Sequence, residues 1–240
     1  MRVVVLGCGT GVGKTRVSVA LLRALSARGL PALGLKPIES GVSRAESDLT
    51  PPVGSDAAQL SAAGTFQTPL PHPLYALREP ISPHLAARRS GVDLSIGQSA
   101  AWVANAEALA SRVLPRSAVF TVVESAGGVF SPLGPNISNF DLARALDPAI
   151  WVLVAADALG VLHDVSSTLK AMRSCGRAPN HLVLSAAREP DASTGSNAPE
   201  LTTLGIAKPS ATLARDDDGG IDALLDRLVA DAESGTAQSL

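Results

Sequence analysis

The fold of this chain follows from one stretch near its start, Val3-Val4-Val5-Leu6-Gly7-Cys8-Gly9-Thr10-Gly11-Val12-Gly13-Lys14-Thr15. A short β-branched run stops at a glycine-rich turn, and apolar residues then recur at helical spacing. Strand, glycine loop and helix in this order are the setting of a Walker A phosphate-binding loop. Backbone N–H groups of such a loop, together with the start of the following helix, bind phosphate anions.

Each position of this loop has an expected role. The Lys14 ammonium neutralises the β- and γ-phosphates of a nucleotide, and the Thr15 hydroxyl takes a place on Mg²⁺. The glycines let the backbone approach the phosphates closely and adopt positive φ. The first glycine departs from the standard spacing, because Cys8 stands where it is usual and Gly7 lies one residue further out. We expect the nucleotide to contact Gly9, Gly11, Val12, Gly13, Lys14 and Thr15.

Composition favours one α/β domain over residues 1–240, with a core of aliphatic residues, since 46% of the chain is hydrophobic and 3% aromatic. The net charge of −2 gives no reason to expect a nucleic-acid partner. Two cysteines, Cys8 and Cys175, cannot form a disulfide framework or a metal cluster. Neither a signal peptide nor an apolar run of membrane-spanning length is present, so we expect no membrane partner and a cytoplasmic location.

Strand and helix patterns alternate along the chain. Strands are expected at 31–35, 118–123, 149–155, 181–184 and near 204–206. Helices are expected after Thr15, after Ser55 and Ser82, and over 95–113, 139–146, from 161, and over 221–232. The segments 42–55, 65–80 and 189–199 look like loops. This alternation predicts a doubly wound, mostly parallel sheet of P-loop NTPase type with helices on both faces.

Two charged residues directly follow expected strands. Lys36 follows the second strand, and only four of the 20 Lys and Arg residues are lysines. Glu124 ends the strand at 118–123, which is the Walker B arrangement for an acid that binds Mg²⁺. Because ligands collect beyond the carboxyl ends of parallel strands, Lys36 and Glu124 should lie beside the phosphates held by Lys14. The glycine pair Gly127-Gly128 indicates backbone that passes close to another group.

Four motifs in this order resemble those of the dethiobiotin synthetases, the ATP-dependent cyclo-ligases of biotin synthesis. They are Gly-Cys-Gly-Thr-Gly-Val-Gly-Lys-Thr (7–15), Lys-Pro-Ile-Glu-Ser-Gly (36–41), Ser-Asp-Ala (55–57) and Glu-Ser-Ala-Gly-Gly (124–128). The family's phosphate loop has the same displaced first glycine. The resemblance extends over about residues 1–186.

The resemblance implies a reaction that joins 7,8-diaminopelargonic acid, CO₂ and ATP into a cyclic urea, through a carbamate and a carbamic–phosphoric anhydride. Lys14 and Lys36 would hold the charge of the transferred phosphoryl group, and Thr10 and Ser40 would bind the carbamate together with Lys36. Mg²⁺ would be held by Thr15, Asp56 and Glu124, and further nucleotide contacts would come from Glu124, Gly127 and Ser185. Gly160, Val161 and Leu162, at a helix start, would receive the substrate's tail carboxylate across the interface of a homodimer.

Some positions depart from the family pattern. Many members carry an acid at the position of Gly9 and an acid or polar residue at Gly11. The usual glycine after the Walker B acid is Ser125, and a usual Leu-Asn-His is Leu-His-Asp at 162–164. The asparagine that reads adenine in many members aligns with Ser185, which implies weak selectivity for the base.

Three other functions share this fold. Partitioning-type ATPase switches carry a signature lysine five residues before the Walker lysine, where this chain has Gly9. An amide-forming ligase of cobalamin synthesis normally adds a glutaminase domain, for which 240 residues leave no room. A non-catalytic nucleotide-binding relative stays open because of the altered segment 162–164.

Overall fold

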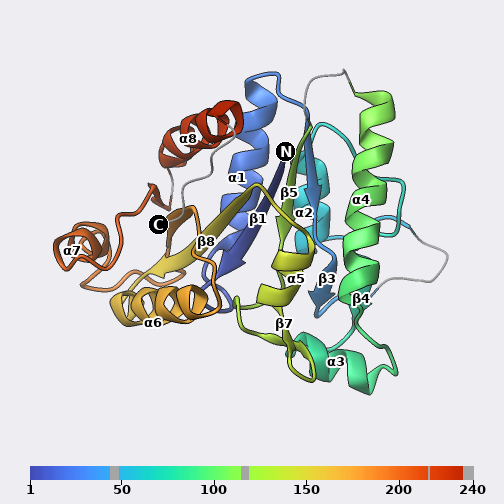
Figure 1. Cartoon of the computed structure of the whole chain (residues 1–240), viewed down its shortest axis with the longest axis horizontal. Helices are drawn as coiled ribbons and strands as arrows, with labels where there is room; N and C mark the ends of the chain where they lie inside the picture. Colours follow the sequence, from blue (N-terminus) through green and yellow to red (C-terminus); the bar gives the residue numbers. More distant parts are fainter. Residues whose placement is uncertain (44–48, 115–118, 216, 235–240) are drawn as a thin grey trace.

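Six parallel strands form the central sheet, in the order β10-β9-β8-β1-β5-β2 (Figure 1). The computed structural model describes residues 1–240 apart from 44–48, 115–118, 216 and 235–240. The strands are β1 (Arg2–Gly7), β2 (Ala32–Leu35), β5 (Phe120–Glu124), β8 (Ile150–Asp157), β9 (His181–Ala186) and β10 (Ala211–Leu213). The expected doubly wound parallel sheet is therefore confirmed. The strand order changes direction at β1, which lies between β8 and β5, so the topological switch point of the sheet is beside β1.

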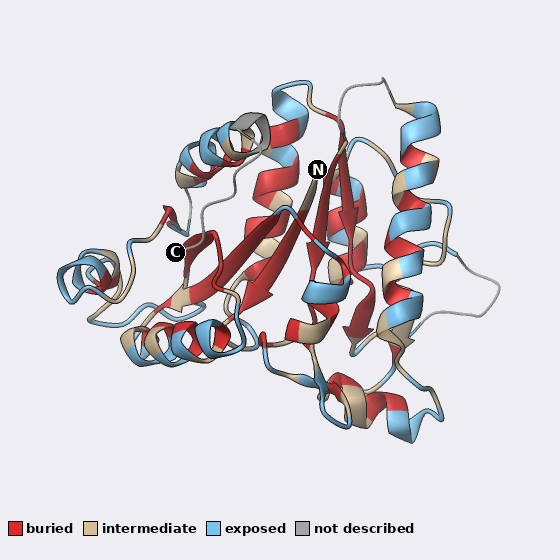
Figure 2. Cartoon of the chain, in the orientation of Figure 1, coloured by how far each residue is buried: buried red, intermediate tan, exposed pale blue. Residues whose placement is uncertain are grey.

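Helices cover both faces of the sheet, as alternate residues of β1 show. Val3 and Val5 pack in the core beneath α1 (Lys14–Ala27), α2 (Asp56–Ala63) and α8 (Gly220–Ser234). Val4 and Leu6 pack in a second core beneath α3 (Pro83–Arg89), α4 (Ile96–Val113), α5 (Asn139–Ala145), α6 (Val161–Ser174) and α7 (Asn197–Thr203). Figure 2 shows the strands buried between these two layers. Within the described residues, no helix is long and apolar enough to cross a membrane.

Two small sheets lie outside the central one. β3 (Ile38–Ser40) pairs in parallel with β4 (Tyr75–Leu77), and β6 (Pro132–Gly134) pairs with β7 (Ile137–Ser138). The segment 65–80, expected as an irregular connection, thus contains a strand. Its partner lies far away in the sequence, and three residues are too few to show an alternating pattern.

The C-terminal third differs from the expectation in one element. The expected strand near 204–206 is wrong, because Leu204 ends helix α7 and Gly205 follows it with a φ of +64°. A glycine in the left-handed region commonly ends a helix. The strand lies later, at β10, and α7 begins inside the segment 189–199 that looked like a loop.

Several expected helix starts and loops are confirmed. The Ser55 hydroxyl accepts the Ala58 N–H at 3.0 Å, and α3 has a proline at its first position. A capping box formed by Ser138 and Asp141 opens α5. The described residues of segment 42–55 contain neither helix nor strand. Residues 44–48 of that segment, and the expected strand start at 118, lie outside the described residues.

Gly34 lets α2 pack closely against β2, and this contact can be tested. A Cβ added at Gly34 would lie 2.6 Å from both the Leu60 carbonyl oxygen and Leu22 Cδ1. We expect Gly34→Ala to lower the free energy of unfolding by about 1–3 kcal/mol, because a backbone atom would have to move. Gly97→Ala in α4 is the control, since its Cβ would meet nothing closer than 3.8 Å. Urea unfolding measures both variants, and equal stability of the two would contradict the close contact.

His181 joins the sheet to α8 and should make stability depend on pH. Its Nδ1 lies 3.0 Å from Ser210 Oγ and its Nε2 lies 3.1 Å from Asp231 Oδ2. Burial lowers the pKa of His181 below its ordinary value of 6.5, although Asp231 opposes this. The unfolded chain therefore binds the proton more readily, and stability should fall as the pH drops below 6.5.

We expect His181→Gln to flatten this part of the pH profile of unfolding, measured between about pH 7 and about pH 5, where histidine titrates. His163→Gln, which changes an exposed histidine on α6, should keep the wild-type slope. A His181→Gln profile as steep as the wild-type profile would show that another group is responsible.

Candidate functional site

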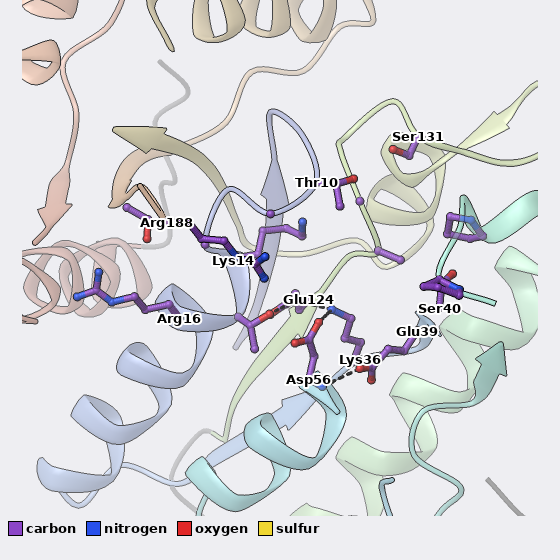
Figure 3. Close-up of a pocket in the computed structure, with 18 of the residues that line it drawn as sticks. Thr10, Lys14, Arg16, Lys36, Glu39, Ser40, Asp56, Glu124, Ser131 and Arg188 are labelled. Carbon is purple, nitrogen blue, oxygen red and sulfur yellow. Dashed lines mark hydrogen bonds and ion pairs between the residues drawn. The ribbon is translucent and has the colours of Figure 1, made fainter. Parts of the chain in front are cut away.

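The phosphate loop between β1 and α1 has the geometry expected of an anion site. Gly11 and Gly13 have φ values of +73° and +92°, and Gly13 is the N-cap of α1. Lys14 is therefore the first residue of the helix, and its ammonium lies 3.4 Å from the Gly9 carbonyl oxygen. The start of α1 and the Lys14 ammonium therefore both lie at the phosphate loop, where an anion would bind (Figure 3).

The displaced first glycine has a physical reason. A Cβ added to Gly7 would lie 2.8 Å from the Gly9 carbonyl oxygen and 2.9 Å from Val12 Cγ2. The loop folds back over Gly7, so this position has no room for a side chain. Gly128 meets the same loop, since its Cβ would lie 3.3 Å from the Cys8 carbonyl oxygen. The expected close approach of the glycine pair is thus a contact between the segment after β5 and the phosphate loop.

Four of the predicted residues meet at the carboxyl ends of β2 and β5. The Lys36 ammonium donates to Glu124 Oε1 at 2.6 Å and also to Asp56 Oδ2. The Thr15 hydroxyl donates to the same Glu124 oxygen at 2.9 Å. Figure 3 shows Lys36, Glu124 and Asp56 pointing toward one another below Lys14. We call Thr15, Lys36, Asp56 and Glu124 the charged cluster.

Burial of Lys36 and Glu124 in the charged cluster, and of Lys14 above it, perturbs the two lysines. Lys36 is 4% exposed and Glu124 is fully buried. Burial disfavours the Lys36 ammonium, but Glu124 and Asp56 outweigh burial and raise the pKa of Lys36 above its ordinary value. For Lys14, burial dominates and lowers the pKa, although Glu124 opposes it. Lys36 is therefore a permanent cation of this site.

The cluster offers oxygen ligands of the kind Mg²⁺ prefers. Among the described residues, Glu124 Oε2 is buried without a hydrogen-bond partner. Asp56 and Thr15 lie beside it and add a carboxylate and a hydroxyl. Mg²⁺ in nucleotide sites is commonly held by one or two carboxylates, a hydroxyl and the phosphates. These residues therefore fit the ion. Within the part of the chain that the structure describes, no group of three or more Asp, Glu, His or Cys side chains could hold a metal ion, so the hydroxyl and the phosphates would complete its ligands.

A cavity of about 880 Å³ opens over the phosphate loop and the charged cluster. Of the expected substrate residues, Thr10, Lys36 and Ser40 line it, as do the nucleotide residues Gly11, Gly13, Gly127 and Ser185. Gly9 and Val12 are not among its lining residues. Gly160, Val161 and Leu162 begin α6 and also do not line this cavity. The structure therefore brings most of the predicted site together and leaves the expected tail-binding segment apart.

Ser185 lies directly beneath the phosphate loop. Its side chain is fully buried, and a Cβ added at Gly13 would lie 2.7 Å from Ser185 Cβ. The cavity continues past Ser185 along Ala186, Ala187, Arg188 and Arg215. The Arg215 guanidinium donates to the carbonyl oxygens of Ala187, at 3.1 Å, and of Arg188. Sequence reasoning missed this arginine, because Arg215 follows a strand of only three residues and belongs to no motif.

Two further residues missed by sequence reasoning support the cluster. The Lys36 backbone N–H donates to His72 Nε2 at 2.9 Å, and His72 is 1% exposed. Glu39 is 5% exposed, and both of its oxygens accept backbone N–H groups at the start of α2. Burial raises the pKa of Glu39, with these backbone hydrogen bonds opposing the change. Glu39 stands inside the motif at 36–41, but its partners lie 17 and 18 residues away.

Solved structures share the fold of this chain. The signal recognition particle receptor FtsY from Elizabethkingia anophelis gives a TM-score of 0.54 at 13% identity, covering 93% of this chain and 65% of that one. A ParA family ATPase from Chlorobium tepidum gives 0.52 at 11% identity, covering 98% and 93%. At these identities the likeness shows the P-loop NTPase fold alone.

Sequence comparison is more specific. A family described as an AAA domain matches residues 1–214. The ATP-dependent dethiobiotin synthetase BioD of Anaeromyxobacter sp. (strain K) is 38% identical over 211 residues, 87% of each chain. The enzyme of the same name from Nitrosospira multiformis is 34% identical, over 71% of this chain and 69% of its own. This chain belongs to the family of the ATP-dependent dethiobiotin synthetases, which are ligases.

Proposed function

We propose that this chain is an ATP- and Mg²⁺-dependent cyclo-ligase that forms the ureido ring of dethiobiotin from 7,8-diaminopelargonic acid and CO₂. One observation carries the proposal. Lys14 and Lys36 come from different strand ends and reach the same cavity, beside the carboxylates of Asp56 and Glu124. The family resemblance of the motifs that contribute these four residues supports the same reaction.

The proposed chemistry needs stabilisation of charge more than a nucleophilic side chain. A substrate amine takes up CO₂ as a carbamate and loses a proton. The carbamate oxygen attacks the γ-phosphorus of ATP, ADP leaves, and a carbamic–phosphoric anhydride forms. The second amine then attacks the carbonyl carbon of the anhydride, loses a proton, closes the ring and expels phosphate. Negative charge develops on phosphoryl oxygens during the attack. Lys14 and Lys36 are buried and already in place at the cavity, and preorganised cations of this kind stabilise such charge.

The remaining lining residues have roles consistent with this reaction. Thr10 and Ser40 line the cavity, and their hydroxyls would bind the carbamate. Ser40 Oγ is buried without a partner among the described residues, so it is available to a ligand. Thr15, Asp56 and Glu124 would hold Mg²⁺, which when bound neutralises charge on the phosphates. Nucleotide phosphates would lie along the backbone of residues 9–15, with further contacts from Gly127 and Ser185.

The substrate tail is proposed to bind across a homodimer. Gly160, Val161 and Leu162 are at the start of α6, outside the cavity formed by their own chain. A helix start carries partial positive charge and accepts a carboxylate. By family resemblance, this helix start serves the site of the partner subunit.

Each lysine of the cavity should be essential for turnover. We expect Lys14→Ala and Lys36→Ala each to reduce urea formation by a factor equivalent to about 2–4 kcal/mol or more, because each removes one cation from the transition state. Lys170→Ala is the control, since this lysine is exposed on α6. Phosphate release is measured with diaminopelargonate and bicarbonate at saturating ATP. Near-normal turnover of Lys36→Ala would show that its assigned role is wrong.

A mixing experiment tests the site shared between subunits. Lys14→Ala should inactivate the phosphate loop, and Leu162→Asp should prevent tail binding by adding a like charge. If each site uses the loop of one subunit and α6 of the other, a heterodimer keeps one intact site. Subunits exchanged in equal amounts should then recover about a quarter of the wild-type activity, as random pairing in a twofold dimer requires.

Sedimentation of the wild-type protein at micromolar concentration accompanies the mixing experiment, and Lys14→Ala mixed with itself is the control. Absence of recovery, or a fully active single chain in sedimentation, would contradict the shared site.

A further inference from the structure

Glu39 is a buried acid in the wall of the cavity that the proposed chemistry does not use. It lies on β3, three residues after Lys36, and its carboxylate points toward the start of α2 (Figure 3). Glu39 Oε1 accepts the Asp56 N–H at 2.6 Å, and Glu39 Oε2 accepts the Ala57 N–H at 3.0 Å. Both oxygens are therefore engaged by the backbone.

These two hydrogen bonds complete the cap of α2. The first N–H groups of a helix have no partners within the helix. In α2 the Ser55 hydroxyl accepts the N–H of Ala58, and Glu39 accepts those of the two residues before it. The first three N–H groups of α2 are thus all hydrogen-bonded to side chains of the protein.

Two residues of the segment 36–39 therefore bind Asp56, one at its backbone and one at its side chain. Its backbone N–H is bound by Glu39, and its carboxylate is bound by the Lys36 ammonium. Asp56 is the first residue of α2, and the residues before it include 44–48, which lie outside the described residues. The contacts from residues 36 and 39 therefore fix where the Asp56 carboxylate stands relative to Glu124.

We propose that Glu39 is a positioning residue for the Mg²⁺ site, which sets the place of the Asp56 carboxylate by binding the backbone at the start of α2. The inference rests on the proposed function, because it takes Asp56 to be a ligand of the ion. Groups that orient metal ligands from behind typically change metal affinity 10–100-fold when they are removed. A buried carboxylate with two backbone N–H donors is well suited to that task, since its charge strengthens both hydrogen bonds.

The competing role for Glu39 is that of a catalytic base for the substrate amine. Its place in the cavity wall and its raised pKa would suit a proton acceptor. Each carboxylate oxygen keeps a second lone pair, but protonation would remove the charge that strengthens both N–H hydrogen bonds to α2, which disfavours a base at this position. The two roles differ in which measurement they affect, since positioning alters Mg²⁺ coupling and a base alters turnover alone.

The test measures how strongly Mg²⁺ tightens nucleotide binding. The dissociation constant of a non-hydrolysable ATP analogue is determined by calorimetry with saturating Mg²⁺ and with EDTA, and the ratio of the two is the Mg²⁺ coupling. Glu39→Ala should reduce this coupling about tenfold or more, as expected for a lost supporting contact, and leave binding in EDTA nearly unchanged. Glu39→Gln, which keeps one acceptor oxygen and the same shape, should show a smaller reduction.

Two further variants make the outcomes distinct. Asp56→Asn should lose the coupling as Glu39→Ala does, whereas Asp141→Ala, which removes a capping acid from α5, should keep it. Lost coupling in Asp56→Asn with full coupling in both Glu39 variants would overturn the positioning role and leave the proposed function standing. Full coupling in Asp56→Asn would overturn the positioning role together with the assignment of Asp56 to Mg²⁺, whereas the proposed ligase activity is tested separately by urea formation. Full coupling in Glu39→Ala with turnover abolished would assign Glu39 as the base instead.

Discussion

The ion pair between Lys36 and Glu124 is the contact on which the site depends. Both side chains are buried, and their charged atoms lie 2.6 Å apart. Removing one partner of such a pair typically costs about 3–5 kcal/mol, because the other charge is left without compensation in a dry environment. The pair forms because β2 and β5 are parallel neighbours with Leu35 opposite Val123, which places the next residue of each strand at the same edge. A shift of one residue in this register would turn each side chain to the opposite face of the sheet.

The same edge carries several polar atoms that the protein itself leaves unsatisfied. Among the described residues, the buried oxygens without a hydrogen-bond partner include those of Ser40, Ser125 and Ser185 and Oε2 of Glu124. Each such group costs about 1–3 kcal/mol of stability when it stays unpaired. Ser40, Ser185 and Glu124 line one cavity, which indicates that stability is given up where a ligand can supply the missing partners.

The sequence predicted the parallel sheet and the meeting of Lys14, Lys36 and Glu124, because strand ends in a parallel sheet share one edge. Other features depend on contacts between distant segments, which no local pattern shows. Glu39 binds backbone groups at the start of α2, and His72 binds the backbone of Lys36. The expected strand near 204–206 is wrong for the related reason that a short Leu-Gly-Ile run fits the end of a helix as well as a strand.

Arg215 connects the far wall of the cavity to the edge of the sheet. It follows β10, a three-residue strand at the edge of the central sheet beside β9, and it binds the backbone after β9. Short edge strands are among the first parts of a protein to open in local unfolding. A ligand that occupies this wall therefore opposes opening of β10 and α8, which pack together. By reciprocity, a change that destabilises this edge of the sheet weakens binding of that ligand, although the edge lies far from the lysines of the phosphate site.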